Sequence, residues 1–316
     1  MAVGRRTVIG AIVAAILSAF AWATYYLFVL WVTPGTAPSA ILAYTFVVGG
    51  VFYTGWALVA GHGRAFAALW RDPMAYVRTG LLAGMQVSVL AATYLTGPVD
   101  ASLLSLIGDV VLTPIIVALF ISVYRAHIAT PLFAVGLIVS LAGGTMAIVG
   151  GQSLSGVQGW AWLAVPGVPI TVAAYFLLTA RANRTLPSSA VVAQSTLASG
   201  VALLIAAPLL PGGYPGLVSV APVPMLLLAL CGLTSFFLAP ALYFLSIEMV
   251  GLVIPPMLMT AIPVFTLLLS AGILGIALPL VGVLGIPVAV AGGVLALRGE
   301  SAVAPEGPPE LSKTAE

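Results

Sequence analysis

The sequence predicts an all-α integral membrane protein with ten transmembrane helices, arranged as two five-helix repeats of inverted topology. Three observations lead to this prediction: an apolar composition, a repeat at a fixed spacing, and basic residues confined to alternate loops. Of the 316 residues, 62% are hydrophobic and 6% are charged, whereas about 25% of the residues in a typical globular domain are charged. We therefore expect most of the chain to lie in lipid.

Apolar runs long enough to cross a bilayer, which takes about 20 helical residues, occur along nearly the whole sequence. We expect ten spans, at residues 8–32, 40–60, 76–95, 101–123, 131–150, 160–180, 189–210, 223–245, 251–272 and 278–298. The first run continues past an A-x-A pattern at Ala19, so it is interpreted as a span rather than as a signal peptide. Residues 299–316, rich in proline and glutamate, are predicted to form a disordered cytoplasmic tail.

The two halves of the sequence resemble each other in one ungapped register. Several residues recur 149 positions later, as in Tyr94 and Tyr243, Pro114 and Pro263, Gly136 and Gly285, and Gly143 and Gly292. We predict a first repeat over residues 1–150 and a second over residues 151–298, each with five spans. Because an odd number of spans reverses the chain's direction, the second repeat must enter the membrane upside down, as in many transporters.

The basic residues support the inversion and set the orientation. All ten Lys and Arg residues fall on one side of the predicted topology, and the loops on the other side contain none. Short loops rich in Lys and Arg stay in the cytoplasm. We therefore predict a multi-pass protein of the cytoplasmic (inner or plasma) membrane, with both termini cytoplasmic.

The spacing of prolines and glycines resembles that of the EamA-type exporters, ten-helix members of the drug/metabolite transporter superfamily. The matching residues are Pro114, Gly136 and Gly143-Gly144 in the first repeat, and Pro263, Gly275, Gly285 and Gly292-Gly293 in the second. The glutamate of the family pattern is absent, since His127 and Ile276 hold its positions. The resemblance covers residues 8–298. It implies a basket of helices around a central substrate cavity, lined mainly by helices 1, 3, 4, 6, 8 and 9, that works by alternating access.

Asp109 is the acidic residue expected deepest in the membrane. It lies about 12 Å inside the span at residues 101–123, where a carboxylate costs roughly 2.5–3.5 kcal/mol. We expect no Lys or Arg within the spans to neutralise it. Asp109 is interpreted either as a hydrogen-bonding residue that holds its helix in place, or as a binding site for a proton or a cationic substrate group.

Other polar and aromatic side chains are predicted to line a cavity with Asp109. Ser105, Asp109 and Thr113 are spaced four residues apart and therefore share a helix face. The remaining candidates for substrate or ion binding are Gln86, Trp22, Tyr25, Tyr175, Gln194, Ser235 and Thr260. The alternative for the aromatic residues is packing or an interfacial belt, which suits Tyr94 and Tyr243 near span ends. Pro114 and Pro263 are candidate hinges, because an internal proline removes a helix hydrogen bond.

These features favour a transporter over an enzyme. An intramembrane aspartyl protease needs two facing carboxylates and a serine or zinc protease needs an embedded histidine, but Asp100, His62 and His127 are predicted in loops. No catalytic residue, metal site or cofactor is predicted. The ATP-binding motif GxxxxGK[ST] does not occur, so transport is expected to use an ion or substrate gradient.

The expected function is export of small neutral, zwitterionic or cationic metabolites, such as amino acids, or of drugs. Transport is predicted to be either proton-coupled or facilitative, and the direction follows from the resemblance alone. One alternative is an exchanger of anions such as nucleotide sugars or sugar phosphates, which would need a basic residue in the cavity. Another is a polar-lined channel. The predicted partners are the small-molecule substrate, the lipid bilayer and protons, without nucleic acid or ATP, and the protein is expected to be a monomer.

Overall fold

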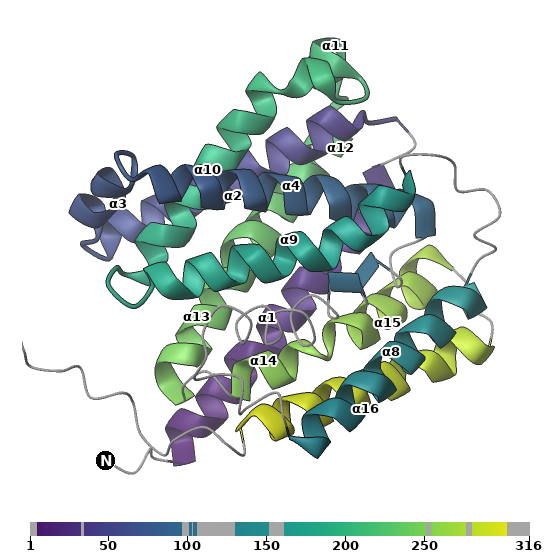
Figure 1. Ribbon diagram of the computed structural model, residues 1–316. Helices are drawn as coiled ribbons and strands as arrows, with labels where there is room; N and C mark the ends of the chain where they lie inside the picture. Colours follow the sequence, from purple (N-terminus) through teal and green to yellow (C-terminus); the bar gives the residue numbers. More distant parts are fainter. Residues whose placement is uncertain are drawn as a thin grey trace, which may run out of the picture.

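The computed structural model describes residues 5–32, 35–96, 101–102, 104–105, 130–151, 161–250, 254–275 and 280–301. Within these ranges, all regular secondary structure is helical (Figure 1). In the first half, the helices are α1 (Arg5–Val32), α2 (Pro38–Val59), α3 (Gly63–Leu69), α4 (Pro73–Thr96) and α8 (Pro131–Gly151). Asp109, Thr113 and Pro114 lie outside the described residues, as do most of the fourth predicted span and the predicted tail from residue 302 onward.

The second half begins with two long helices and continues with shorter pieces. They are α9 (Ala161–Ala182), α10 (Ser188–Ile205), η4 (Ala207–Leu209), α11 (Gly213–Val218), α12 (Pro222–Cys231), η5 (Gly232–Leu238), α13 (Ala239–Val250), α14 (Ile254–Met259), α15 (Ile262–Leu274) and α16 (Leu280–Ser301). The prolines at the starts of α2 and α12 are well placed, because the first turn of a helix does not use their missing N–H group.

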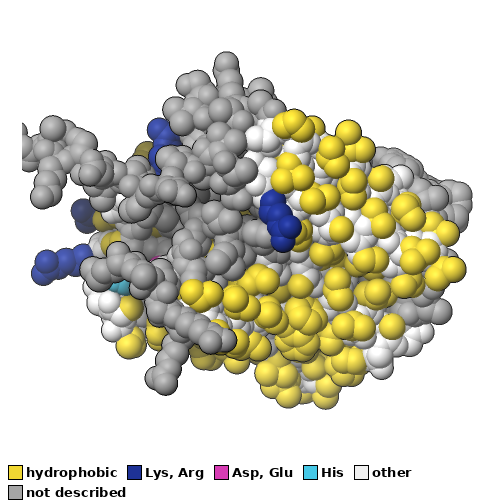
Figure 2. Space-filling model, turned by 90° about the horizontal axis from the view of Figure 1, so that it is seen from below, with side chains coloured by type: hydrophobic (Ala, Val, Ile, Leu, Met, Phe, Trp, Pro, Cys, Tyr) yellow, Lys and Arg dark blue, Asp and Glu magenta, His cyan; other side chains and the backbone are white. Residues whose placement is uncertain are grey.

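The helices are apolar enough for a lipid environment. Five described stretches are long and apolar enough to cross a membrane: Val8–Val32, Pro38–Val59, Pro73–Leu95, Ser188–Ile205 and Pro222–Met249. Shorter apolar stretches are Pro131–Met146, Ile170–Thr179, Ile262–Ile273 and Leu280–Ala296. Figure 2 shows a broad hydrophobic face with most of its visible basic side chains near one edge. A continuous apolar surface of this kind is suited to lipid rather than to water.

Helices α8 and α16 lie side by side through small residues (Figure 1). A Cβ atom at Gly143 would overlap the backbone of Ala289, and one at Gly292 would overlap the backbone of Ser140. From Ser140 to Gly143 the residue number rises along α8, while the contacted residue on α16 falls from Gly292 to Ala289. The two helices therefore run antiparallel. The contacts are also equivalent, because Gly292 and Ala289 lie 149 positions after Gly143 and Ser140. Glycine thus permits the close backbone approach that is common between membrane helices.

Other helices also pair across the two halves of the chain. α2 packs on α10, α4 on α9, and α1 on α13. Between α2 and α10, a Cβ at Gly50 would overlap the backbone of Leu197, and one at Gly200 would come close to the backbone of Val47. These contacts again require two antiparallel helices in close approach.

The predicted eighth span changes its hydrogen-bonding pattern midway, from α12 through the π-helical turn η5 to α13. Pro240 gives a physical reason, because a proline has no N–H group and its ring clashes with the carbonyl four residues earlier, here that of Phe236. A π turn widens the helix at that point. The widened turn packs closely on α2, since a Cβ at Gly232 would lie 2.6 Å from the carbonyl oxygen of Thr45.

The predicted ninth span is broken rather than bent at the candidate hinge. α14 ends at Met259, and α15 begins at Ile262 with Pro263 in its first turn. α15 then ends at Leu274 and is capped by Gly275, whose φ of 63° is the left-handed conformation that glycine adopts without a steric penalty.

Candidate substrate cavity

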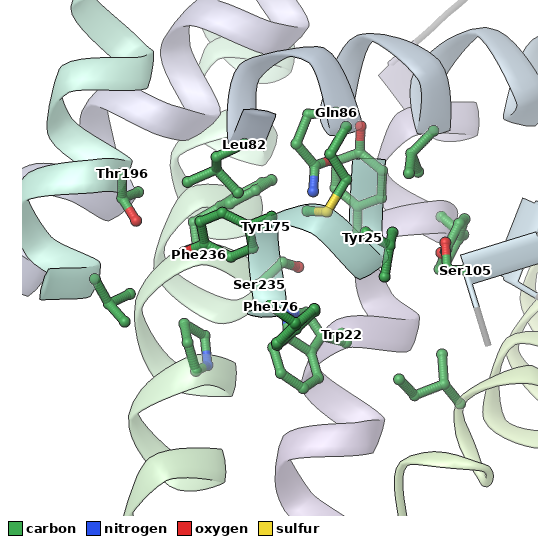
Figure 3. A pocket seen from close by; sticks show the side chains of 17 residues that line it. Trp22, Tyr25, Leu82, Gln86, Ser105, Tyr175, Phe176, Thr196, Ser235 and Phe236 are labelled. Atoms are coloured by element: carbon green, nitrogen blue, oxygen red, sulfur yellow. The ribbon is translucent and has the colours of Figure 1, made fainter. Parts of the chain in front are cut away.

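An internal cavity lies where helices of the two halves meet (Figure 3). The space between the wall residues is about 810 Å³, part of it open to solvent. The aromatic part of the wall consists of Trp22, Tyr25, Tyr26, Tyr175, Phe176 and Phe236. The polar part consists of Gln86, Ser105, Thr196 and Ser235. Most of the remaining wall is aliphatic, so the cavity suits a ligand with an apolar body and a few polar groups.

Six of the candidate residues named from the sequence line this cavity: Trp22, Tyr25, Gln86, Ser105, Tyr175 and Ser235. Two others are buried but are not part of the cavity wall. Gln194 donates a hydrogen bond from Nε2 to Thr79 Oγ1 at 3.5 Å. Thr260 lies at the break between α14 and α15. The structure therefore gathers most of the described candidates at one place.

The aromatic rings of the wall hold one another in position. Tyr25 makes edge contacts with Tyr26 and Phe236, at centroid distances of 5.5 and 5.6 Å. Trp22 packs against Tyr243 at 5.5 Å. Edge and tilted arrangements of this kind are favourable for aromatic pairs. Tyr243 is therefore a buried support for Trp22, in agreement with the packing alternative; Tyr94 is 38% exposed, as an interfacial residue would be.

Two polar atoms of the cavity residues lack a partner within the described part of the chain: the phenol oxygen of Tyr25 and Oε1 of Gln86. Both side chains lie on the wall in Figure 3. A buried polar atom without a hydrogen bond costs about 1–3 kcal/mol. Gln86 and Tyr25 therefore each have one buried polar atom that the fold leaves without a hydrogen bond.

The serines of the wall are already used inside the protein. Ser235 Oγ donates to the carbonyl oxygen of Ala21 at 3.2 Å. Ser105 Oγ donates to the carbonyl oxygen of Ala101 at 3.1 Å and lies 3.1 Å from the phenol oxygen of Tyr26. These two predicted ligand-binding residues have a structural role in this conformation.

Several wall residues could not be singled out from the sequence. Leu82, Met85, Phe176 and Phe236 are apolar residues in apolar helices, so composition gives them no distinguishing signal. The repeat would have helped in part. Gln86 and Ser235 occupy equivalent positions and both line the cavity, as do Tyr26 and Tyr175.

Arg78 contradicts the expectation that no basic residue lies within a span. It is the sixth residue of α4, inside the apolar stretch Pro73–Leu95, and it is only 3% exposed. Its Nη2 atom lies 3.5 Å from Oδ2 of Asp72. Because a buried arginine is present in this helix, a lack of basic residues is no longer an argument against substrates that carry a negative group.

Comparison with known proteins agrees with the fold. Residues 158–298 match the model of the EamA-like transporter family. This family is part of the drug/metabolite transporter superfamily. No match was found among curated proteins. One crystal structure of a protein shares 21% sequence identity, with a TM-score of 0.66 over 93% of this chain and 99% of that chain. At this identity the likeness shows the fold alone.

The EamA-like residues run from α9 through most of α16. They supply Tyr175, Phe176, Ser235 and Phe236 to the cavity, whereas Gln86 comes from outside the matched region. Members of the EamA family are membrane transporters and not enzymes. The apolar helices and the internal cavity are consistent with a multi-pass membrane transporter of this kind.

Proposed function

We propose that the protein is a secondary transporter that exports small organic molecules through the cavity by alternating access. The observation that carries this proposal is an aromatic cavity in an apolar helical bundle, whose wall includes Gln86 and Tyr25, two residues with a polar atom that the fold leaves unpartnered. Rings of this kind bind flat apolar groups and organic cations, and the amide and the phenol provide hydrogen bonds. Neutral, zwitterionic or cationic metabolites and drugs match this lining.

Asp109 is proposed to bind a proton or the cationic group of the substrate. It follows Ser105, a wall residue, by four positions in the sequence. A carboxylate in a membrane span is costly unless it is neutralised, so uptake of a proton or a cation there is favourable. Proton coupling and facilitative transport both remain compatible with this role.

Two inverted five-helix repeats, with both termini cytoplasmic, are proposed as the architecture that permits alternating access. The contact of Gly143 with Ala289 is repeated by that of Gly292 with Ser140, at equivalent positions of the two repeats. This equivalence supports a two-fold relation between the halves. The antiparallel run of these helices supports inversion, because the axis of such a relation lies in the membrane plane. The two halves can then rock about the cavity between them.

Flux measurements in liposomes test the proposed transport. Labelled amino acids and organic cations are offered to reconstituted protein at two pH values, with unlabelled substrate on the opposite side. A carrier gives saturable flux that is stimulated by substrate on the opposite side. Flux that follows the electrochemical gradient without exchange would identify a channel instead. Exchange restricted to nucleotide sugars or sugar phosphates would establish the anion exchanger.

Cysteine labelling tests the inverted topology. In a Cys231→Ser background, Gly35→Cys and Ala182→Cys are introduced singly and labelled with an impermeant reagent. The two positions belong to loops of opposite sides in the proposed topology, so labelling is expected from opposite sides of the membrane. Labelling of both from the same side would contradict the inversion.

A further inference from the structure

Arg78 lies next to the cavity, on the same face of α4 as two of its wall residues. Arg78, Leu82 and Gln86 are spaced four residues apart and therefore share a helix face, and Leu82 and Gln86 line the cavity. Arg78 is thus one turn beyond the wall, toward the start of α4, where α3 also lies. We call this side the α3 end of the bundle. Long side chains in helices lean toward the helix N-terminus, so the Arg78 side chain leans toward the α3 end.

Polar side chains of α9 and α10 surround the same region. The phenol group of Tyr175, a wall residue, lies near the side chains of Thr179 and Ser195 and within electrostatic range of Arg78. Thr179 follows Tyr175 by four residues on the same face of α9, and Asn183 comes four residues later, just after the end of the helix. A row of polar groups therefore continues from the cavity toward the α3 end.

The charge of Arg78 is incompletely neutralised. Its Nη2 atom meets Asp72 Oδ2 at 3.5 Å, whereas charge-assisted hydrogen bonds are usually about 2.7–2.9 Å long. The other oxygen of Asp72 accepts a hydrogen bond from the backbone N–H of Met74 at 3.0 Å. Asp72 therefore also caps the start of α4. The Asp72 side chain is 37% exposed, whereas that of Arg78 is 4% exposed.

Further polar atoms without a partner accompany this ion pair. Nε of Arg78, Oε1 of Gln194 and Oδ1 of Asn183 have none within the described ranges. Gln194 is adjacent in the structure, because its Nε2 donates to Thr79, the neighbour of Arg78. A buried guanidinium needs a paired negative group with good geometry to offset its desolvation. Asp72 supplies only part of this.

We propose that Arg78 binds the carboxylate of a zwitterionic or anionic substrate at the α3 end of the cavity, and that Asp72 occupies the guanidinium while the site is empty. The proposal rests on the proposed function, since it assumes a small molecule in this cavity. The flat, forked guanidinium matches a carboxylate in two parallel hydrogen bonds. The apolar body of such a substrate then lies among the aromatic rings, with Gln86 and Tyr25 available for its other polar group.

Equilibrium binding to the purified full-length protein tests this assignment. Three probes share a phenyl ring: phenylacetate carries only a carboxylate, L-phenylalanine carries both charges, and phenethylamine carries only an ammonium group. In Arg78→Gln, both carboxylates are expected to bind at least about tenfold more weakly, the loss that follows from removal of a charge-assisted hydrogen bond. Phenethylamine binding is expected to be unchanged. Arg71→Gln, at an exposed arginine near the same end, is the matched control.

The variant Asp72→Asn distinguishes a purely structural ion pair from one in which Asp72 competes with the substrate for Arg78. If Arg78 only holds Asp72, the two substitutions weaken binding of all three probes alike. If Asp72 competes with the substrate, Asp72→Asn tightens carboxylate binding while Arg78→Gln weakens it. Arg78→Lys keeps the charge without the fork and is expected to fall between wild type and Arg78→Gln. It also provides a folded variant if the glutamine variant is unstable.

The possible results separate this inference from the proposed function. Equal carboxylate affinity in Arg78→Gln and Arg71→Gln would overturn the role of Arg78. Wild-type protein that binds phenethylamine but neither carboxylate would overturn it as well, while leaving a transporter of cations intact. Failure of the transport proposal has a different signature, namely flux through wild-type protein without saturation or counterflow for any substrate.

Discussion

The third and eighth predicted spans are equivalent in the two repeats, yet they differ in how they provide polar groups. α4 is one regular helix, whereas its counterpart is divided into α12, η5 and α13. At the 149-residue spacing, Arg78, Thr79 and Gln86 of α4 correspond to Leu227, Leu228 and Ser235. The eighth span thus has leucines and a serine where α4 has larger polar side chains. Its backbone, unlike that of α4, is irregular.

Hydroxyl groups on both helices tie the eighth span to α1. Thr234 Oγ1 lies 3.2 Å from Thr24 Oγ1, and Ser18 Oγ donates to the carbonyl oxygen of Ala239 at 2.7 Å. In α4, by contrast, Nε of Arg78 and Oε1 of Gln86 have no partner in the described part of the chain. The comparison indicates that α4 retains unpartnered atoms on two large polar side chains, whereas the eighth span uses its hydroxyl groups for packing.

The largest expected effect is at Asp109, a first-repeat residue whose counterpart is Leu258. Asp109→Asn is expected to abolish proton coupling or recognition of cations while the protein still folds and inserts, because an amide neither takes up a proton nor carries a charge. The measurement is transport by reconstituted protein at two pH values. Glu248→Gln is the control, since Glu248 is an exposed carboxylate of α13. An Asn variant with unchanged rate and pH dependence would place the chemistry elsewhere.

A smaller loss is expected at Gln86. Gln86→Met keeps the length of the side chain but removes the amide, so transport at low substrate concentration is expected to fall about tenfold, the value of one ligand hydrogen bond. Ser235→Ala at the equivalent position is expected to change transport less than about threefold, because that hydroxyl already bonds to Ala21. Initial counterflow rates check both values. Equal losses in the two variants would mean that the repeats contribute alike to the site.

The close packing of the eighth span can be tested by stability. Gly232→Val is expected to destabilise the protein by about 1–3 kcal/mol, because a Cβ at Gly232 would lie 2.6 Å from a backbone oxygen of α2. Gly84→Val in α4 is expected to change stability by less than about 0.5 kcal/mol, since a Cβ there would meet no described atom within 4 Å. Thermal unfolding in detergent measures the difference. Similar melting temperatures for the two variants would contradict this contrast between the spans.

The helices could be predicted from the sequence because length and hydropathy govern them. The run at residues 40–60 forms α2 (Pro38–Val59), and that at 278–298 forms α16 (Leu280–Ser301). Part of the cavity could be predicted as well, since Trp22, Gln86 and Tyr175 stand out as polar or aromatic residues in apolar helices. Each of them lies on its wall.

Two features of the site required the structure. Arg78 lies near the end of a span, where counting charges by loop assigns it to the cytoplasmic side, and only packing by α9 and α10 reveals that it is buried. Phe236 is apolar, as a lipid-facing residue would be, so the sequence does not single it out. Its position on the wall depends on the π turn, which changes the direction of every side chain beyond it. Local irregularities of this kind leave no trace in hydropathy.

The smallest effect is expected from Pro240→Ala, which tests the origin of the π turn. An alanine at position 240 restores an N–H group that can donate to the carbonyl of Phe236, so the α-helical pattern is expected to continue through η5. Stability is expected to change by less than about 1 kcal/mol, whereas the apparent substrate affinity should fall because Ser235 and Phe236 are turned relative to the cavity. Melting temperature and the substrate dependence of counterflow measure the two effects.

Pro222→Ala, in the first turn of α12, is the control, because a proline there replaces no helix hydrogen bond. If both variants retain wild-type affinity, Pro240 does not set the π turn. The close approach of Gly232 to α2 would then be its cause, and packing rather than proline would distinguish the eighth span from α4.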